Sequence, residues 1–150
     1  MSKTVMQFGA RALGRGFIVP ILIDSGCEVV LVDAYEELVD ELKEKGSYTL
    51  YIADAEPDLQ YRSIAPRQSL SMNTDRDEII KCLQSIDTVT TSVRKENLVA
   101  IAQIISEAWD DDKNEGRMVI CCENLENASA YFKGLLSQCA KDAAHEKRLM

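Results

Sequence analysis

The chain has 150 residues, which is enough for a single domain with a sizeable core. Hydrophobic residues make up 46% and charged residues 28%, a balance typical of globular proteins rather than of disordered or fibrous chains. The formal net charge of -8 at pH 7 excludes a general nucleic-acid binder, because nucleic-acid phosphates would be repelled.

Apolar runs and cysteine usage limit the class further. The longest apolar run, residues 17–23, is too short to span a bilayer, so no membrane partner is expected, and no secretory signal pattern is present. The five cysteines form no Cys-x-x-Cys pair and the chain has one histidine, which argues against a structural zinc site. We expect reduced thiols in a cytoplasmic protein.

The first elements follow from the apolar pattern. A buried strand is predicted over residues 3–8, then a glycine-bearing turn over 9–16 that leads into a helix from about 13 to 25. Pro20 lies inside that helix and predicts a kink, because proline removes a backbone hydrogen bond. A second strand over 28–32 ends at Asp33.

The middle of the chain is less regular. An amphipathic helix is predicted over residues 35–45, closed by Gly46. Alternating residues follow from Tyr48, and short antiparallel strands are expected at 61–64 and 69–72.

Helix and strand then alternate to the end of the chain. The predicted elements are helix 75–84 with Thr74 as its N-cap, strand 87–92, helix 96–109, strand 117–122 and helix 124–139. Residues 110–116 are predicted to be a solvated loop, and His145 and Lys147 to lie at a solvated helix end. This alternation predicts a three-layer α/β domain over residues 1–150, with a mostly parallel sheet and helices on both faces.

The turn after the first strand carries a partial dinucleotide fingerprint. The pattern G-x-G-x-x-G places one glycine at a tight turn, one where backbone approaches a pyrophosphate, and one where the helix packs on the sheet. Gly9 and Gly14 stand at the first and third places, and Arg11 stands at the second. Asp33 follows 24 positions after Gly9, near the spacing of an acid that binds the adenosine ribose and favours NAD over NADP.

Four landmarks along the chain resemble the mannitol-1-phosphate 5-dehydrogenases of the long-chain mannitol dehydrogenase family. Residues 8–18 (FGARALGRGFI) resemble that family's FGAGNIGRGFI start, and Val32-Asp33 resembles its ribose-binding acid. Residues 87–93 (DTVTTSV) resemble its DxVTTAV strand, and residues 120–125 (ICCENL) resemble its IACENM segment.

The resemblance implies an NAD-binding Rossmann-like domain of a polyol-phosphate oxidoreductase. The residues that it places at the cofactor are Gly9, Arg11, Leu13, Gly14 and Arg15 at the pyrophosphate, Asp33 at the ribose, and Ser92, Val93 and Asn124 toward the nicotinamide. No catalytic residue and no metal ligand carry over. Family members continue into a helical substrate domain, so a sugar alcohol or keto-sugar phosphate is expected as a partner only where that domain is present. The apolar face on which it would dock could drive self-association.

Two departures from the family leave the cofactor site open to two interpretations. Arg11 and Ala12 replace glycine and asparagine, and Arg94 replaces a glycine after the 87–93 strand. Added bulk at Arg11 predicts weak cofactor binding, which Arg11→Gly with Ala12→Asn would tighten. A guanidinium that holds a phosphate predicts the opposite. The alternative to a cofactor domain is a non-catalytic remnant that acts as an interaction module.

Overall fold

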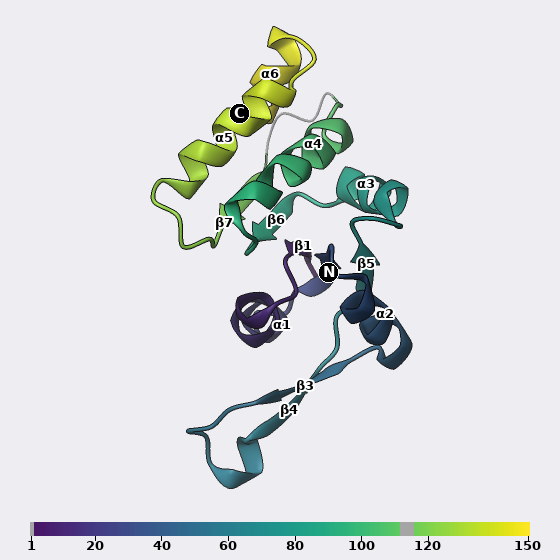
Figure 1. The fold of residues 1–150 in the computed structure, drawn as a ribbon, viewed down its shortest axis with the longest axis vertical. Coiled ribbons are helices and arrows are strands. Elements are labelled where there is room, and N and C mark those ends of the chain that lie inside the picture. The colour runs from purple at the N-terminus through teal and green to yellow at the C-terminus, as the bar shows by residue number, and fades with distance from the viewer. Residues whose placement is uncertain (1, 112–115) are drawn as a thin grey trace.

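The computed structural model describes residues 2–111 and 116–150, and its centre is a five-stranded parallel sheet (Figure 1). The strand order is β5-β2-β1-β6-β7. The strands are β1 (Thr4–Phe8), β2 (Glu28–Asp33), β5 (Gln68–Ser71), β6 (Thr88–Thr91) and β7 (Met118–Cys121). In chain order this is the 3-2-1-4-5 arrangement of dinucleotide-binding domains, and the chain reverses direction across the sheet between β1 and β6.

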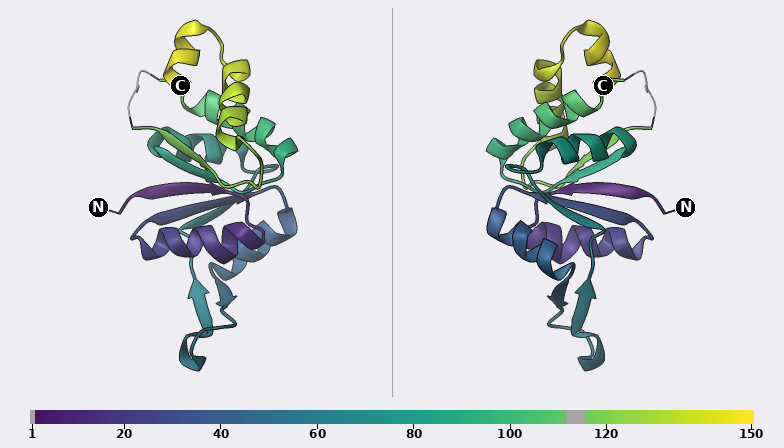
Figure 2. Two further views of the ribbon diagram at one scale, coloured as in Figure 1. Left: turned by 90° about the vertical axis from the view of Figure 1, so that its left-hand side faces the viewer. Right: turned by 90° about the vertical axis from the view of Figure 1, so that its right-hand side faces the viewer.

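Helices cover both faces of the sheet, which confirms the predicted three-layer α/β class (Figure 2). One face carries the helical run η1 (Gly14–Ile18) and α1 (Val19–Asp24), together with α2 (Glu36–Lys45). The opposite face carries α3 (Arg76–Ser85), α4 (Leu98–Ala108) and α5 (Ala128–Cys139). Two apolar clusters fill these layers, the larger one around Met6, Val30 and Val89 and the smaller one around Val29 and Leu31. Within the described residues, no helix is long and apolar enough to cross a membrane.

A two-stranded arm projects from the body between α2 and β5 (Figures 1 and 2). Its strands are β3 (Tyr48–Tyr51) and β4 (Tyr61–Ile64), which pair antiparallel, with a 3-10 turn at Pro57–Leu59 near the tip. The antiparallel strand predicted at 61–64 is confirmed, and its partner is the alternating segment that begins at Tyr48. The prediction of a further antiparallel strand at 69–72 is wrong. Residues 68–71 form β5, which pairs parallel with β2 inside the main sheet, because three of its four residues are buried rather than alternating.

The first helix changes type between Ile18 and Val19, just before Pro20, where the sequence predicted a kink. Gly14–Ile18 is a π-helical turn in which Val19 N donates to Gly14 O, so the carbonyl of Arg15 would next require an N–H at position 20. Proline has none. The hydroxyl of Tyr48 donates to Arg15 O instead, at 2.7 Å, so the arm supplies the hydrogen bond that Pro20 withholds.

In the C-terminal helix α6 (Ala143–Leu149) the prediction of a solvated helix end is wrong for His145, whereas Lys147 is exposed as predicted. His145 is 1% exposed: Lys141 N donates to its Nδ1 at 3.1 Å, and its Nε2 lies 3.0 Å from Ser106 O. Since Nδ1 accepts, Nε2 carries the proton and donates to Ser106 O, which ties α6 to the middle of α4. The tail is therefore part of the packed structure.

Two smaller predictions concern the N-cap of α3 and the acidic loop. Helix α3 has Asp75 rather than Thr74 at its N-cap position, and the Asp75 carboxylate accepts from Ser71 N and from the Lys43 ammonium instead of capping. In the predicted acidic loop, residues 112–115 lie outside the described residues. Asp110, before them, pairs with Lys141 and Arg148.

Candidate functional site

The turn after β1 needs glycine at two positions. Gly9 has a φ of +105°, its N–H donates to Val32 O at 2.8 Å, and a Cβ there would overlap the carbonyl oxygen of Ser92. A Cβ at Gly14 would overlap the carbonyl oxygen of Gly9. Gly9 thus makes the tight turn and Gly14 brings the helix against it, the roles of the first and third glycines of the fingerprint.

A buried glutamine stabilises this turn through side-chain hydrogen bonds. Gln7 is fully buried, and its Nε2 donates to Phe8 O and Gly9 O at 2.9 Å and to Ser92 Oγ at 2.8 Å. Its Oε1 accepts from Thr90 Oγ1. One side chain therefore joins the ends of β1 and β6 at the point where the sheet reverses. Sequence reasoning missed this role, although a polar residue inside an apolar strand was a signal for it.

Asp33 ends β2 with its carboxylate held in place by backbone amides. Ala10 N donates to Oδ2 at 2.7 Å and Tyr35 N donates to Oδ1 at 2.8 Å. A carboxylate has about four acceptor positions, so two remain for other donors. The carboxylate is therefore oriented but not saturated.

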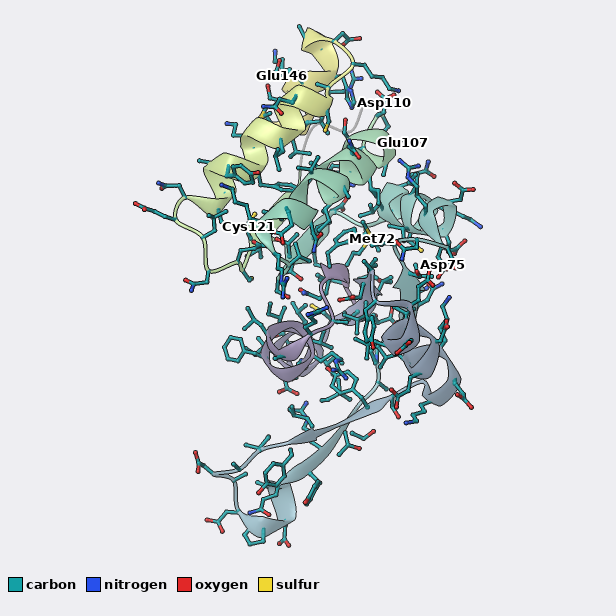
Figure 3. The ribbon with its side chains drawn as sticks, viewed as in Figure 1. Met72, Asp75, Glu107, Asp110, Cys121 and Glu146 are labelled. Carbon is teal, nitrogen blue, oxygen red and sulfur yellow. The ribbon has the colours of Figure 1, made fainter. Side chains whose placement is uncertain are left out.

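A cleft of about 720 Å³ opens at this carboxyl edge of the sheet. It lies where ligands bind in open parallel α/β sheets, and its volume falls within the range of roughly 300–1,000 Å³ typical of small-molecule sites. Residues from the ends of β1, β2, β5 and β6 and from α4 line it, among them Asp33, Met72, Ser92, Arg94 and Ile104. Met72 stands just beyond β5, at the side of the sheet opposite Cys121 of β7 (Figure 3).

Five of the nine predicted site residues line this cleft, and four do not. Gly9, Arg11, Asp33, Ser92 and Val93 do. Gly14 lies behind the turn, Leu13 is exposed on the helix, and the Arg15 guanidinium lies over the Tyr48 ring at 5.7 Å. Asn124 is exposed in the segment after β7. The helix predicted from residue 124 begins only at Ala128, so Asn124 precedes α5. Contact of all nine residues with a cofactor stays a prediction.

Other lining residues escaped the sequence analysis. They share a place just after a strand or at the start of the following helix, and they are Tyr35, Met72, Asn73, Arg76, Glu96, Asn97 and Ala100. Asn73 Nδ2 donates to Ala34 O at 3.0 Å, which links the ends of β2 and β5. Their positions follow the rule that sites form at carboxyl ends of parallel strands, but that rule does not select residues without the strand order.

The β7 end of the edge is built differently. Val93 N donates to Glu123 Oε1 at 3.3 Å, and the buried Oε2 of Glu123 has no hydrogen-bond partner among the described residues. Burial raises the pKa of the Cys121 and Cys122 thiols. Both cysteines are therefore poor thiolate nucleophiles at neutral pH.

Comparison with known proteins agrees with this fold. A family model described as the mannitol dehydrogenase Rossmann domain matches residues 3–149. A mannitol-1-phosphate 5-dehydrogenase of Bacillus licheniformis is 34% identical over 85% of this chain and 34% of its own length. Its counterpart in Geobacillus thermodenitrificans is 37% identical over 80% of this chain and 31% of its own length. The chain thus spans about a third of the length of the curated relatives that it matches.

Solved structures support the fold alone, because their sequence identities are low. A glycerol-3-phosphate dehydrogenase of Coxiella burnetii matches with a TM-score of 0.60 and 12% identity over 94% of this chain and 38% of that one. A TrkA-N domain of an Escherichia coli inner membrane protein matches with a TM-score of 0.55 and 15% identity, over 90% of this chain and 83% of that one. Given the family model and the identities above, the chain belongs to the mannitol dehydrogenase family, in which it forms the NAD-binding Rossmann domain.

Proposed function

We propose that the cleft binds the adenosine diphosphate half of NAD(H), with Asp33 accepting hydrogen bonds from the two adenosine ribose hydroxyls. The observation that carries the proposal is the Asp33 carboxylate, which two backbone amides orient at the cleft and which keeps two acceptor positions free. A diol is the group that such a fixed pair of acceptors fits.

The rest of the cleft fits the same ligand. Met72, Ala100, Ile101 and Ile104 offer an apolar wall for a planar base. Gly9 and Arg11 of the turn line the cleft, so a diphosphate bound there would lie against the end of β1. The cofactor supplies or accepts a hydride when bound, and the role of this chain is to hold and orient its other half.

Asp33 also predicts which cofactor is preferred. A phosphate on the ribose 2′-oxygen would remove one hydroxyl donor and place negative charge beside the carboxylate. NAD(H) therefore binds in preference to NADP(H).

The wider reaction that we propose is oxidation or reduction of a polyol phosphate, as the names of the relatives suggest. In this proposal residues 1–150 are one cofactor-binding domain, and a second domain holds the substrate and moves its proton. The chain's length, about a third of these relatives, is consistent with that division.

An exposed apolar stripe suggests where such a second domain would pack. Leu13, Phe17 and Ile21 recur every four residues along the first helix, and Phe17 is 60% exposed. Met118 and Ile120 are exposed on β7, on the sheet face that carries α1 and α2. Left uncovered, these residues would promote self-association, which sedimentation of the chain and of a Phe17→Ser variant would reveal.

Calorimetric titration of the purified chain with NADH and with NADPH tests the proposed cofactor. We expect NADH to bind and NADPH to bind at least tenfold more weakly, about 1.4 kcal/mol. Equal or tighter binding of NADPH contradicts the role of Asp33. If neither dinucleotide binds, the interaction-module alternative takes the place of the cofactor domain.

A further inference from the structure

The cleft is more cationic than the molecule around it. The chain has 17 Lys and Arg residues against 25 Asp and Glu, yet the cleft is lined by three arginines and only two acids, Asp33 and Glu96. Arg76 forms an ion pair with Glu107 at 2.6 Å. The two remaining arginines, Arg11 and Arg94, form no ion pair or hydrogen bond through their side chains with any residue that the structure describes.

These two arginines stand on either side of the point where the sheet reverses. Arg11 follows β1, Arg94 follows β6, and the two strands are paired neighbours. The ends of both strands are joined rigidly, because Ser92 N donates to Phe8 O at 2.8 Å and Gln7 bonds to both sides. The two side chains therefore rise from a fixed base at the same edge of the cleft.

Arg11 shows no backbone strain at the position where the fingerprint has its second glycine. Asn127 is the one non-glycine residue with positive φ in the described part of the chain, so Arg11 adopts an ordinary backbone conformation. Both Arg11 and Arg94 are exposed, and their long side chains can swing aside or turn to a ligand. The backbone conformation at position 11 therefore does not call for a glycine, and the weak cofactor binding expected from the bulk of Arg11 stays a prediction.

One backbone amide of this turn is already engaged, because Ala10 N donates to Asp33 Oδ2. The two negative charges of a diphosphate bound here match two guanidinium groups, each able to form paired hydrogen bonds.

We propose that Arg11 and Arg94 form a side-chain clamp for the diphosphate of the bound dinucleotide. This inference rests on the proposed function and names the residues that distinguish diphosphate-bearing ligands from a bare nucleoside. The clamp makes the charge of the ligand, rather than close backbone approach at a second glycine, the main source of affinity at the turn.

The test compares three probes, adenosine, ADP and NADH, on the wild-type chain and on Arg11→Gln, Arg94→Gln and the double variant. Lys95→Gln is the matched control, because Lys95 is an exposed cation next to Arg94 whose ammonium lies over the Tyr131 ring and outside the cleft. We expect each arginine variant to weaken ADP binding about tenfold while adenosine affinity and the Lys95→Gln variant stay unchanged. The salt dependence of ADP binding should become shallower in the double variant, since fewer charged contacts remain to be screened.

Contrary outcomes separate the two proposals. If wild-type chain binds ADP and NADH but the double variant binds them as well or better, the arginines obstruct the site and the clamp is wrong while the cofactor site stands. A loss that affects adenosine as much as ADP also overturns the clamp, because it signals damage to the cleft. If the wild-type chain binds none of the three probes, the proposed function fails and the clamp fails with it.

Discussion

The two ends of the sheet's carboxyl edge differ in how firmly their polar groups are held. At the β2 and β1 end, Asp33 is fixed by two backbone amides and Gln7 ties the turn to β6. At the β7 end, Asn124 is exposed and Glu123 keeps a buried oxygen without a partner among the described residues (Figure 3 shows Cys121 at this end). Under the proposed function, the domain offers fixed polar groups to one half of a dinucleotide and few to the other half.

The largest effect is expected from Gly14→Ala, in the turn between β1 and the first helix. A Cβ at this position overlaps the carbonyl oxygen of Gly9, so the helix must move off the turn. We expect a loss of about 3 kcal/mol or more in the free energy of unfolding, measured by urea denaturation. Gly16→Ala is the control, because no heavy atom from outside its own stretch of helix lies within 4 Å of its Cβ position, and it should change stability by less than about 1 kcal/mol. Similar stability of both variants would contradict the close packing at Gly14.

Asp33→Ala should weaken NADH binding by about 1–3 kcal/mol, because ribose hydroxyls and the Ala10 amide lose their acceptor. Calorimetry would measure the change, with Asp40→Ala, an exposed residue of α2, as the control. An unchanged affinity for NADH would show that Asp33 does not bind the cofactor, and would contradict the comparison of the two ends of the sheet.

The hydrogen bond from the Tyr48 hydroxyl to Arg15 O supports the first helix, and its contribution to stability should depend on pH. Burial raises the pKa of its hydroxyl to about 12, from an ordinary value of 10. Its contribution to stability is therefore complete below pH 10 and is lost as the pH rises through 12. Tyr48→Phe should lower the free energy of unfolding by about 1 kcal/mol at pH 8, because the Arg15 carbonyl loses its donor.

The difference between wild-type and Tyr48→Phe stability should then shrink in denaturant titrations between pH 10 and 12. Tyr51→Phe, in the exposed part of the arm, should match the wild type at every pH. A difference between wild type and Tyr48→Phe that stays constant with pH would mean that the hydroxyl does not act through this bond.

The smallest effect is expected at the open end. Since the β7 end presents no fixed groups to the cleft, NADH should bind the chain less than tenfold more tightly than ADP-ribose, a difference under about 1.4 kcal/mol. Asn124→Ala should change neither affinity. An NADH advantage of a hundredfold, lost in Asn124→Ala, would show that the nicotinamide half is complete in this chain.

Local patterns in the sequence predicted most of the fold. The alternation of apolar strands and amphipathic helices predicted the layered sheet, and the residue spacing from Gly9 to Gly14 and Asp33 predicted the turn and the acid that meet at the cleft. These features depend on periodicity and on backbone geometry, which neighbouring residues encode.

Contacts between distant segments settled the rest. His145 looks like a solvated tail residue until Ser106, 39 positions earlier, offers it a carbonyl, and Pro20 looks like a simple kink until Tyr48 bonds to Arg15. Which residues line the cleft likewise depends on strand order, because β1 and β6 become neighbours only when the sheet forms. The sequence by itself determined the elements and the turn chemistry, whereas tertiary structure decided burial and partnership, since a polar group's environment is set by whatever the fold brings beside it.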